Sequence, residues 1–186
     1  MKGENDMSLY TNLVIAIPHS VGEVMDVDWT VERQVAAFRD RYVDWETDEL
    51  FSVERSGARV IKFPVCRIDV DAERLEHEKD RIGNCSIISD GRVALTNSQR
   101  NKRLGLWFKY RAELMEAASE GESPIIIDCH SFPNDLASGV DICIGYNEDA
   151  SKPDAEVIEK VCSIFSDAGY SVVHNRPFSN AIAPLG

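Results

Sequence analysis

Short apolar runs that alternate with longer amphipathic segments constrain the fold of this chain more than any other feature of its sequence. The apolar runs are typical of buried strands, which we expect at residues 12–17, 58–66, 124–131, 140–145 and 170–175. The segments between them have helical spacing or capping residues, and we expect helices at residues 28–42, 97–118 and 153–169, with a short one starting near Asp44. Because strands and helices alternate, the sequence predicts an α/β fold, a three-layer αβα sandwich around a largely parallel sheet.

The composition is typical of one acidic globular domain. A chain of 186 residues is long enough to bury its own core, and no linker or low-complexity segment interrupts it, so a single domain over residues 1–186 is expected. The net charge of −12 repels phosphate backbones and anionic lipids, which argues against nucleic acid or a membrane as partner. The sequence has neither an apolar run of roughly 20 residues nor a signal-peptide core, so a cytoplasmic location is expected. Nothing in these patterns predicts an oligomeric state.

The five cysteines stand singly, mostly inside apolar runs, and no C-x-x-C pair occurs. This distribution predicts reduced, buried thiols for Cys66, Cys85, Cys129, Cys143 and Cys162. Cys129 has a histidine beside it, but burial in an apolar strand raises the pKa of a thiol, so a nucleophilic role is not expected.

Two of the apolar runs end in a histidine, His19 in "VIAIPHSVGE" and His130 in "PIIIDCHS". In open α/β sheets, binding sites form outside the carboxyl ends of the strands, where both histidines would lie. Imidazole is the commonest metal ligand, and a catalytic zinc typically has three protein ligands of the histidine and carboxylate type. The alternative is that each is an ordinary loop histidine, since His77 in a charged run and His174 at another strand end show how common the pattern is.

The third ligand has several candidates in the sequence alone. Glu23, Asp44 and Asp48 are carboxylates close enough along the chain to complete a zinc site with the two histidines. The same ligand types also suit other divalent transition metals.

Six segments, in this order, closely resemble the N-formylglutamate amidohydrolase family from Val14 to the C-terminus: "IPHS", "DWETDELF", "CRIDVDAER", "IIIDCHSFP", "VDICIG" and "HNRPFS". The resemblance implies a fold like that of zinc carboxypeptidases and aspartoacylase, a phosphorylase/hydrolase-like sandwich with a mixed, mostly parallel sheet. It also implies a zinc-dependent hydrolase that cleaves the N-acyl amide of an acidic amino acid, typically N-formyl-L-glutamate, in amino-acid metabolism such as histidine degradation. The expected partner is therefore a small acidic N-acyl amino acid.

The resemblance also implies roles for the candidate ligands. His19 and His130 match the two histidine ligands, and Asp44 matches the family's Asp-Trp segment. In the related carboxypeptidases a glutamate three residues after the first histidine binds zinc, but Gly22 occupies that position here. Asp44 is therefore ranked first as the third ligand, followed by Asp48 and Glu23. Asp128 is expected to support His130 as a hydrogen-bond acceptor.

An anion site is implied by two arginines. Arg67 and Arg74 resemble the family's pair that holds substrate carboxylates, and a guanidinium binds a carboxylate in bidentate fashion. Relatives usually have Asn before the second arginine, whereas this chain has Glu73. The alternative is a surface ion network of the two arginines with Asp69, Asp71 and Glu73. Asn175 and Arg176 match a segment expected to line the substrate pocket.

Catalysis by this family needs a carboxylate base, which in the relatives lies on a strand after the "N-x-P-F" segment. No Asp or Glu follows Asp167, so the chain is expected to lack the family's C-terminal strand, or to be truncated. Arg67, Glu23 and Asp48 are the residues expected to take part in catalysis, with Glu73 as a further candidate base. The alternative function is a non-catalytic member that binds acidic metabolites or peptides.

Overall fold

The computed structural model describes residues 12–25, 39–53, 57–75, 95–120 and 123–180. Two compact units make up the chain: Met1–Ser131 together with Pro184–Gly186, and Phe132–Ala183. Among the described residues, no helix is both long and apolar enough to cross a membrane.

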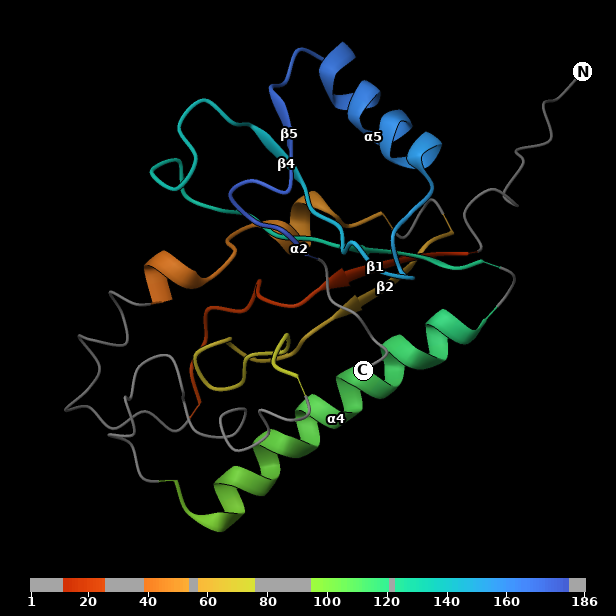
Figure 1. Ribbon diagram of the computed structural model, residues 1–186. Helices are drawn as coiled ribbons and strands as arrows, with labels where there is room; N and C mark the ends of the chain where they lie inside the picture. The colour runs from red at the N-terminus through yellow and green to blue at the C-terminus, as the bar shows by residue number, and fades with distance from the viewer. Residues whose placement is uncertain (1–11, 26–38, 54–56, 76–94, 121–122, 181–186) are drawn as a thin grey trace, which may run out of the picture. The chain divides into compact units, whose positions relative to one another are not determined.

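The first unit is built on a parallel three-stranded sheet (Figure 1). Its strands are β1 (Leu13–Ile17), β2 (Arg59–Lys62) and β3 (Ile125–Asp128), in the order β2-β1-β3. The register pairs Val14 with Arg59 on one side of β1 and with Ile126 on the other. Because β1 has a neighbour on both edges, four of its five residues are buried, as a near-continuous apolar run predicts for a central parallel strand.

A long helix, α4 (Asn97–Ser119), packs against β1 and β2 of this sheet (Figure 1). It starts at a capping box, in which the Thr96 hydroxyl accepts a hydrogen bond from the Gln99 N–H and the Gln99 side chain accepts one from the Thr96 N–H. Its sheet-facing stripe includes apolar and aromatic side chains at helical spacing, but also two arginines: Arg103, Trp107, Tyr110, Arg111, Leu114 and Ala117 are buried.

The segment after β2 folds into the core of the first unit rather than over its surface. Residues 68–72 alternate between apolar side chains and carboxylates, and both kinds are buried. Phe63 meets Tyr110 of α4 edge to face, with ring centroids 5.1 Å apart. Buried Asp69 accepts a hydrogen bond from Arg103 of α4 at 3.1 Å, which neutralises both charges inside the core.

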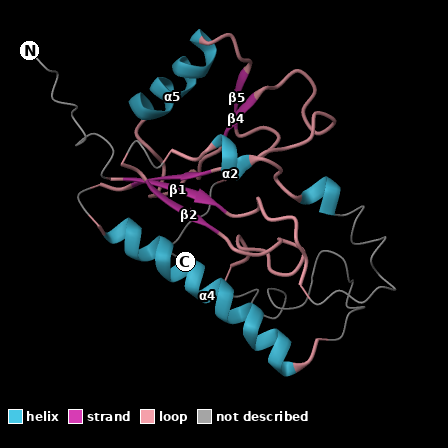
Figure 2. Ribbon diagram, turned by 180° about the vertical axis from the view of Figure 1, so that it is seen from behind, coloured by secondary structure: helices cyan, strands magenta, loops and turns pink. Residues whose placement is uncertain are grey.

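The second unit contains the parallel strands β4 (Ile142–Ile144) and β5 (Val172–His174) with helix α5 (Ala155–Asp167) packed on both (Figure 2). Pro153 precedes the helix. The left-handed Gly169 follows it, and the next residue, Tyr170, donates its N–H to the carbonyl of Phe165. These features match the common asymmetry of proline at helix starts and glycine at helix ends.

The expected α/β class with mostly parallel pairing is confirmed, since every strand pair among the described residues is parallel. The strands are shorter than the apolar runs, and the short helix expected from Asp44 is α2 (Thr47–Leu50). Of the helix expected at 28–42, only residues 39–42 are described, and they are helical; residues 28–38, His77 and Cys85 lie outside the described residues. The prediction that all thiols are buried holds for Cys66 and Cys129 and is wrong for the partly exposed Cys143 and Cys162.

Candidate metal centre

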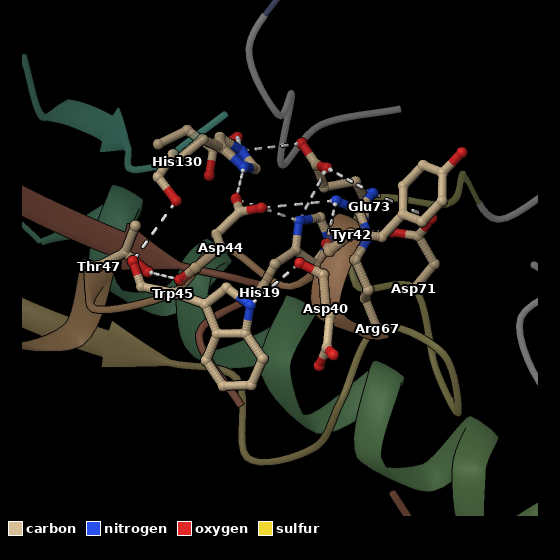
Figure 3. A network of polar contacts seen from close by, with 12 residues as sticks. His19, Asp40, Tyr42, Asp44, Trp45, Thr47, Arg67, Asp71, Glu73 and His130 are labelled. Carbon is tan, nitrogen blue, oxygen red and sulfur yellow. Dashed lines mark hydrogen bonds and ion pairs between the residues drawn. The ribbon is translucent and has the colours of Figure 1, made fainter. Parts of the chain in front are cut away.

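The two histidines that end apolar runs lie next to each other in the first unit (Figure 3). His19 follows β1 and His130 follows β3, and these two strands pair in parallel, with Ala16 opposite Asp128. Their carboxyl ends therefore meet at one edge of the sheet, and the imidazole centroids are 5.2 Å apart. His19 is fully buried, whereas the His130 side chain keeps 31% of its exposure.

Asp44 completes a group of three possible metal ligands with these histidines. Its backbone N–H donates to the carbonyl of His19 at 3.0 Å, and its own carbonyl accepts the Thr47 hydroxyl at 2.7 Å, so the turn before α2 is held against the end of β1. The buried Asp44 Oδ2 lies 2.6 Å from His130 Nδ1 and 3.9 Å from His19 Nδ1.

Two further carboxylates reach the histidines from the segment after β2. Asp71 Oδ1 lies 3.1 Å from His19 Nε2. Glu73 bridges both rings, with Oε2 3.4 Å from His19 Nδ1 and Oε1 3.3 Å from His130 Nε2. Asp128 adds an oxygen 3.4 Å from His130 Nε2. Two more possible ligand groups result, His19 with Asp71 and Glu73, and His130 with Glu73 and Asp128.

The carboxylates and histidines shift one another's pKa values in the directions that favour charge. Burial alone would raise the pKa of Asp71, but His19, Arg67 and Arg74 hold it well below its usual range. Burial opposes ionisation of Glu73 too, and the bond to His130 with the charge of His19 lowers its pKa. Burial would likewise depress the pKa of His130, but its bonds to Asp128, Asp44 and Glu73 raise it strongly. The negative carboxylates of the centre therefore stabilise a positive charge placed between them.

The residues of this centre fit a divalent metal ion. His19 Nδ1 is buried without a hydrogen-bond partner, although it faces the carboxylates of Asp44 and Glu73, and a buried polar atom of this kind is costly unless something binds it. Four carboxylates surround the two rings. When the imidazoles are neutral, the guanidiniums of Arg67 and Arg74 balance only two of the four negative charges. Histidine nitrogens and carboxylate oxygens are the donor set of zinc and related transition metals.

Arg67 and Arg74 lie at the rim of the centre. The Arg67 guanidinium lies 3.7 Å from Asp71 and 3.8 Å from Asp44, and Arg74 Nε lies 3.5 Å from Asp71. Both side chains stay partly exposed. The alternative of an ion network is confirmed in part, since Arg67 pairs with Asp71 and Glu73, and Arg74 pairs with Asp71. It is wrong for Asp69, which pairs with Arg103 in the core, and Asp71 is buried rather than at the surface.

Asp48 and Glu23, the other candidate carboxylates, join none of the ligand groups found in the described part of the chain. Asp48 on α2 is paired with Lys62, whose hydrogen bond lowers the pKa of Asp48. Glu23 is exposed and belongs to none of the three ligand groups among the described residues. Asn175 and Arg176 lie in the second unit, where the Asn175 side chain accepts the N–H of Tyr146.

The sequence predicts Arg67, Arg74 and Glu73 near the substrate, but it does not predict that Asp71 and Glu73 contact the histidines. One signal was available: Ile68, Val70 and Ala72 alternate with the acids, and carboxylates within an apolar alternation need buried partners. Cys129, beside His130, has its pKa raised to about 12 by burial, as expected for an inert thiol.

Known proteins show what this arrangement is similar to. A family model described as N-formylglutamate amidohydrolase matches residues 11–185. No curated protein matches the chain. The crystal structure of an N-formylglutamate amidohydrolase from Ralstonia eutropha JMP134 is similar with a TM-score of 0.67 and 19% sequence identity, over 92% of this chain and 74% of that one. At this identity the structural likeness establishes a shared fold.

Proposed function

The chain belongs to the N-formylglutamate amidohydrolase family, and on that basis we propose that it is a metal-dependent hydrolase of N-formyl-L-glutamate or a similar N-acyl derivative of an acidic amino acid. The family membership supports hydrolysis of an amide. The metal and the substrate are proposed from the chemistry of the centre.

One observation carries the proposal of a metal. The buried, unbonded Nδ1 of His19 faces carboxylate oxygens beside the second imidazole. His19, Asp44 and His130 would hold the ion, which we propose to be zinc. A zinc ion supplies Lewis-acid polarisation of the scissile carbonyl and lowers the pKa of water when it is bound.

The surrounding residues orient these ligands. Asp71 accepts a hydrogen bond at His19 Nε2, which leaves Nδ1 as the nitrogen available for coordination. Asp128, at 3.4 Å from His130 Nε2, has the corresponding role for the second ring. Carboxylates in these positions fix the tautomer and increase the basicity of the ligating nitrogen.

The positive charge that an acidic substrate needs is present at the rim. We assign Arg67 and Arg74 to the substrate carboxylate, because their partly exposed guanidiniums lie beside the ligands. Asn175 and Arg176 are proposed to bind substrate because they match the segment to which the family resemblance assigns that role. The same positive charge at Arg67 would also stabilise negative charge that develops on the substrate during hydrolysis.

We propose that one of three carboxylates is the catalytic base. Glu23 and Asp48 are the bases expected from the sequence, and Glu73 is the member of the three that contacts both histidines. A base must reach a water next to the reacting carbonyl, directly or through one more water. Substitutions Glu23→Gln and Asp48→Asn therefore belong to the test of the mechanism.

We also propose that the whole chain forms the three-layer αβα sandwich expected from the sequence. The likeness to the solved amidohydrolase supports a common fold. Within each unit the described strand pairs are parallel, as such a fold requires of most of its pairs.

The test measures zinc content together with formate release from N-formyl-L-glutamate. We expect about one zinc per chain and turnover that is lost in His130→Ala, whereas His77→Ala, which removes a histidine that the sequence predicts to be solvated, should keep both. Stoichiometric zinc without turnover of any N-acyl amino acid would refute the enzyme and favour a binder of acidic metabolites. A protein without bound metal would refute the metal centre itself.

A further inference from the structure

Glu73 is placed at the centre in a way that the proposed ligand set does not use. Like Asp44, it contacts both histidines through its carboxylate: Oε2 lies 3.4 Å from His19 Nδ1 and Oε1 lies 3.3 Å from His130 Nε2 (Figure 3). It also belongs to two of the three possible ligand groups. The Glu73 backbone is tied to the centre as well, since its N–H donates to Asp71 Oδ1, the oxygen that faces His19 Nε2.

The distances suit a ligand. Two donor atoms that each lie about 2.1 Å from one zinc ion in tetrahedral geometry are roughly 3.4 Å apart. The separation of Glu73 Oε2 from the buried His19 Nδ1 is 3.4 Å, whereas that of Asp44 Oδ2 is 3.9 Å. Of the carboxylates of Glu73 and Asp44, that of Glu73 therefore lies nearer to the His19 nitrogen that has no hydrogen-bond partner.

The contacts of Glu73 to the histidines are shorter than its contact to the anion site. Its nearest approach to the Arg67 guanidinium is 4.0 Å, longer than to either imidazole. A carboxylate that only neutralised the arginines would face the guanidiniums instead.

We propose that Glu73 is a fourth protein ligand of the metal, beside His19, Asp44 and His130. This inference rests on the proposed function, because it assumes a metal at the centre. Four protein ligands are typical of a closed zinc site, whereas three are typical of a site with an open catalytic position. Glu73 would then set how tightly this chain holds its metal, and its carboxylate would occupy a position that an incoming substrate or water has to share or replace.

The test compares metal binding rather than activity. Metal-free wild-type protein, Glu73→Gln and Glu73→His are titrated with zinc against a chelator, and with Co²⁺, whose visible absorption reports the number and kind of ligands. Glu49→Gln is the matched control, since it removes the same charge from an exposed residue of the same unit. Circular dichroism of the metal-free proteins establishes that each variant is folded.

We expect Glu73→Gln to weaken zinc binding by more than about tenfold and to change the Co²⁺ spectrum. Tenfold is the smallest loss of affinity typical when a residue that only supports a ligand is removed. Glu73→His should bind more tightly than Glu73→Gln, with a spectrum shifted from that of the wild type. Glu49→Gln should match the wild type in both. Unchanged affinity and spectrum in folded Glu73→Gln would overturn the inference, and loss of turnover in that case would identify Glu73 as the base. A wild-type protein that binds neither ion would overturn both this inference and the proposed function.

Discussion

At the scale of single residues, the centre depends on which nitrogen of each ring is left for a metal. The bond between Asp71 and His19 Nε2 directs Nδ1 toward Asp44 and Glu73. His130 differs, because carboxylates lie next to both of its nitrogens. The orientation of His19 is therefore set by one partner, and that partner gives a clear test.

Asp71→Asn should weaken zinc binding by roughly 10- to 100-fold, because the amide keeps the shape of the carboxylate but loses the charge that makes the imidazole a stronger donor. Chelator competition measures the change. Asp40→Asn, at an exposed aspartate paired with Arg39, should leave the affinity unaltered. Equal affinity in both variants would show that Asp71 does not act through His19.

The sequence was sufficient to nominate His19 and His130, because each comes directly after an apolar run that had to be a strand. Parallel pairing then placed the two strand ends together. Asp71 and Glu73 could not be placed in the same way, since the segment that carries them has no regular secondary structure and its path depends on packing against α4. The local alternation of acids with apolar residues indicates that the acids are buried, but it does not say which groups they contact.

At the scale of elements, α4 connects the strands to the segment that supplies Asp71 and Glu73. Its bounds were predicted to within one residue, at 97–118 against the observed Asn97–Ser119. Its buried face was predicted less well. Apolar Phe108 and Met115 are exposed, whereas the charged Arg103 and Arg111 are buried. The arginines are buried because Asp69 pairs with the first and Trp107 stacks on the second.

Thr96→Ala should lower the free energy of unfolding by about 1 kcal/mol, because the Gln99 N–H at the start of α4 loses its side-chain acceptor. Denaturant unfolding followed by circular dichroism measures the loss. Ser98→Ala, two residues further on and without a capping role, should be neutral or slightly stabilising, since alanine has the higher helix propensity. If the two variants unfold alike, the capping box does not stabilise the helix.

Arg103→Met should cost about 3 to 5 kcal/mol of unfolding free energy, because it leaves the carboxylate of Asp69 buried without its cation. Lys102→Met, at an exposed position of the same helix, should change stability by less than about 0.5 kcal/mol. Chemical denaturation of both variants provides the comparison. A small loss for Arg103→Met would mean that water or another group replaces the guanidinium.

At the scale of the whole molecule, the division into two compact units was not expected from the sequence. The boundary after Ser131 lies in "DCHSFPND", which has no glycine- or serine-rich composition that would mark a linker. The single domain over residues 1–186 stays a prediction. The α/β class was accessible because it depends only on the alternation of elements, whereas the grouping of elements depends on which surfaces pack together.

The described thiols of the two units should differ in reactivity. Burial raises the pKa of Cys66 to about 11 and that of Cys129 to about 12, so these two thiols of the first unit stay protonated at pH 8, and alkylation requires the thiolate. Cys143 of the second unit is partly exposed. Iodoacetamide labelling followed by peptide mass spectrometry should modify Cys143 well before the two buried thiols, whose labelling should increase as the pH approaches 11 to 12. Early labelling of Cys66 would contradict its burial.

Gly22 has a consequence for how such a site can change during evolution or by design. A Cβ atom built at this position would lie 2.6 and 2.8 Å from two carbons of the Trp45 indole, and the indole N–H is bonded to the carbonyl of Asp40. Any side chain here must first displace Trp45. The route to a carboxypeptidase-like ligand set, with a glutamate three residues after the first histidine, is therefore blocked for a single substitution. An ancestor or a designer would have to exchange Gly22 and Trp45 together, so these two positions are expected to change as a pair.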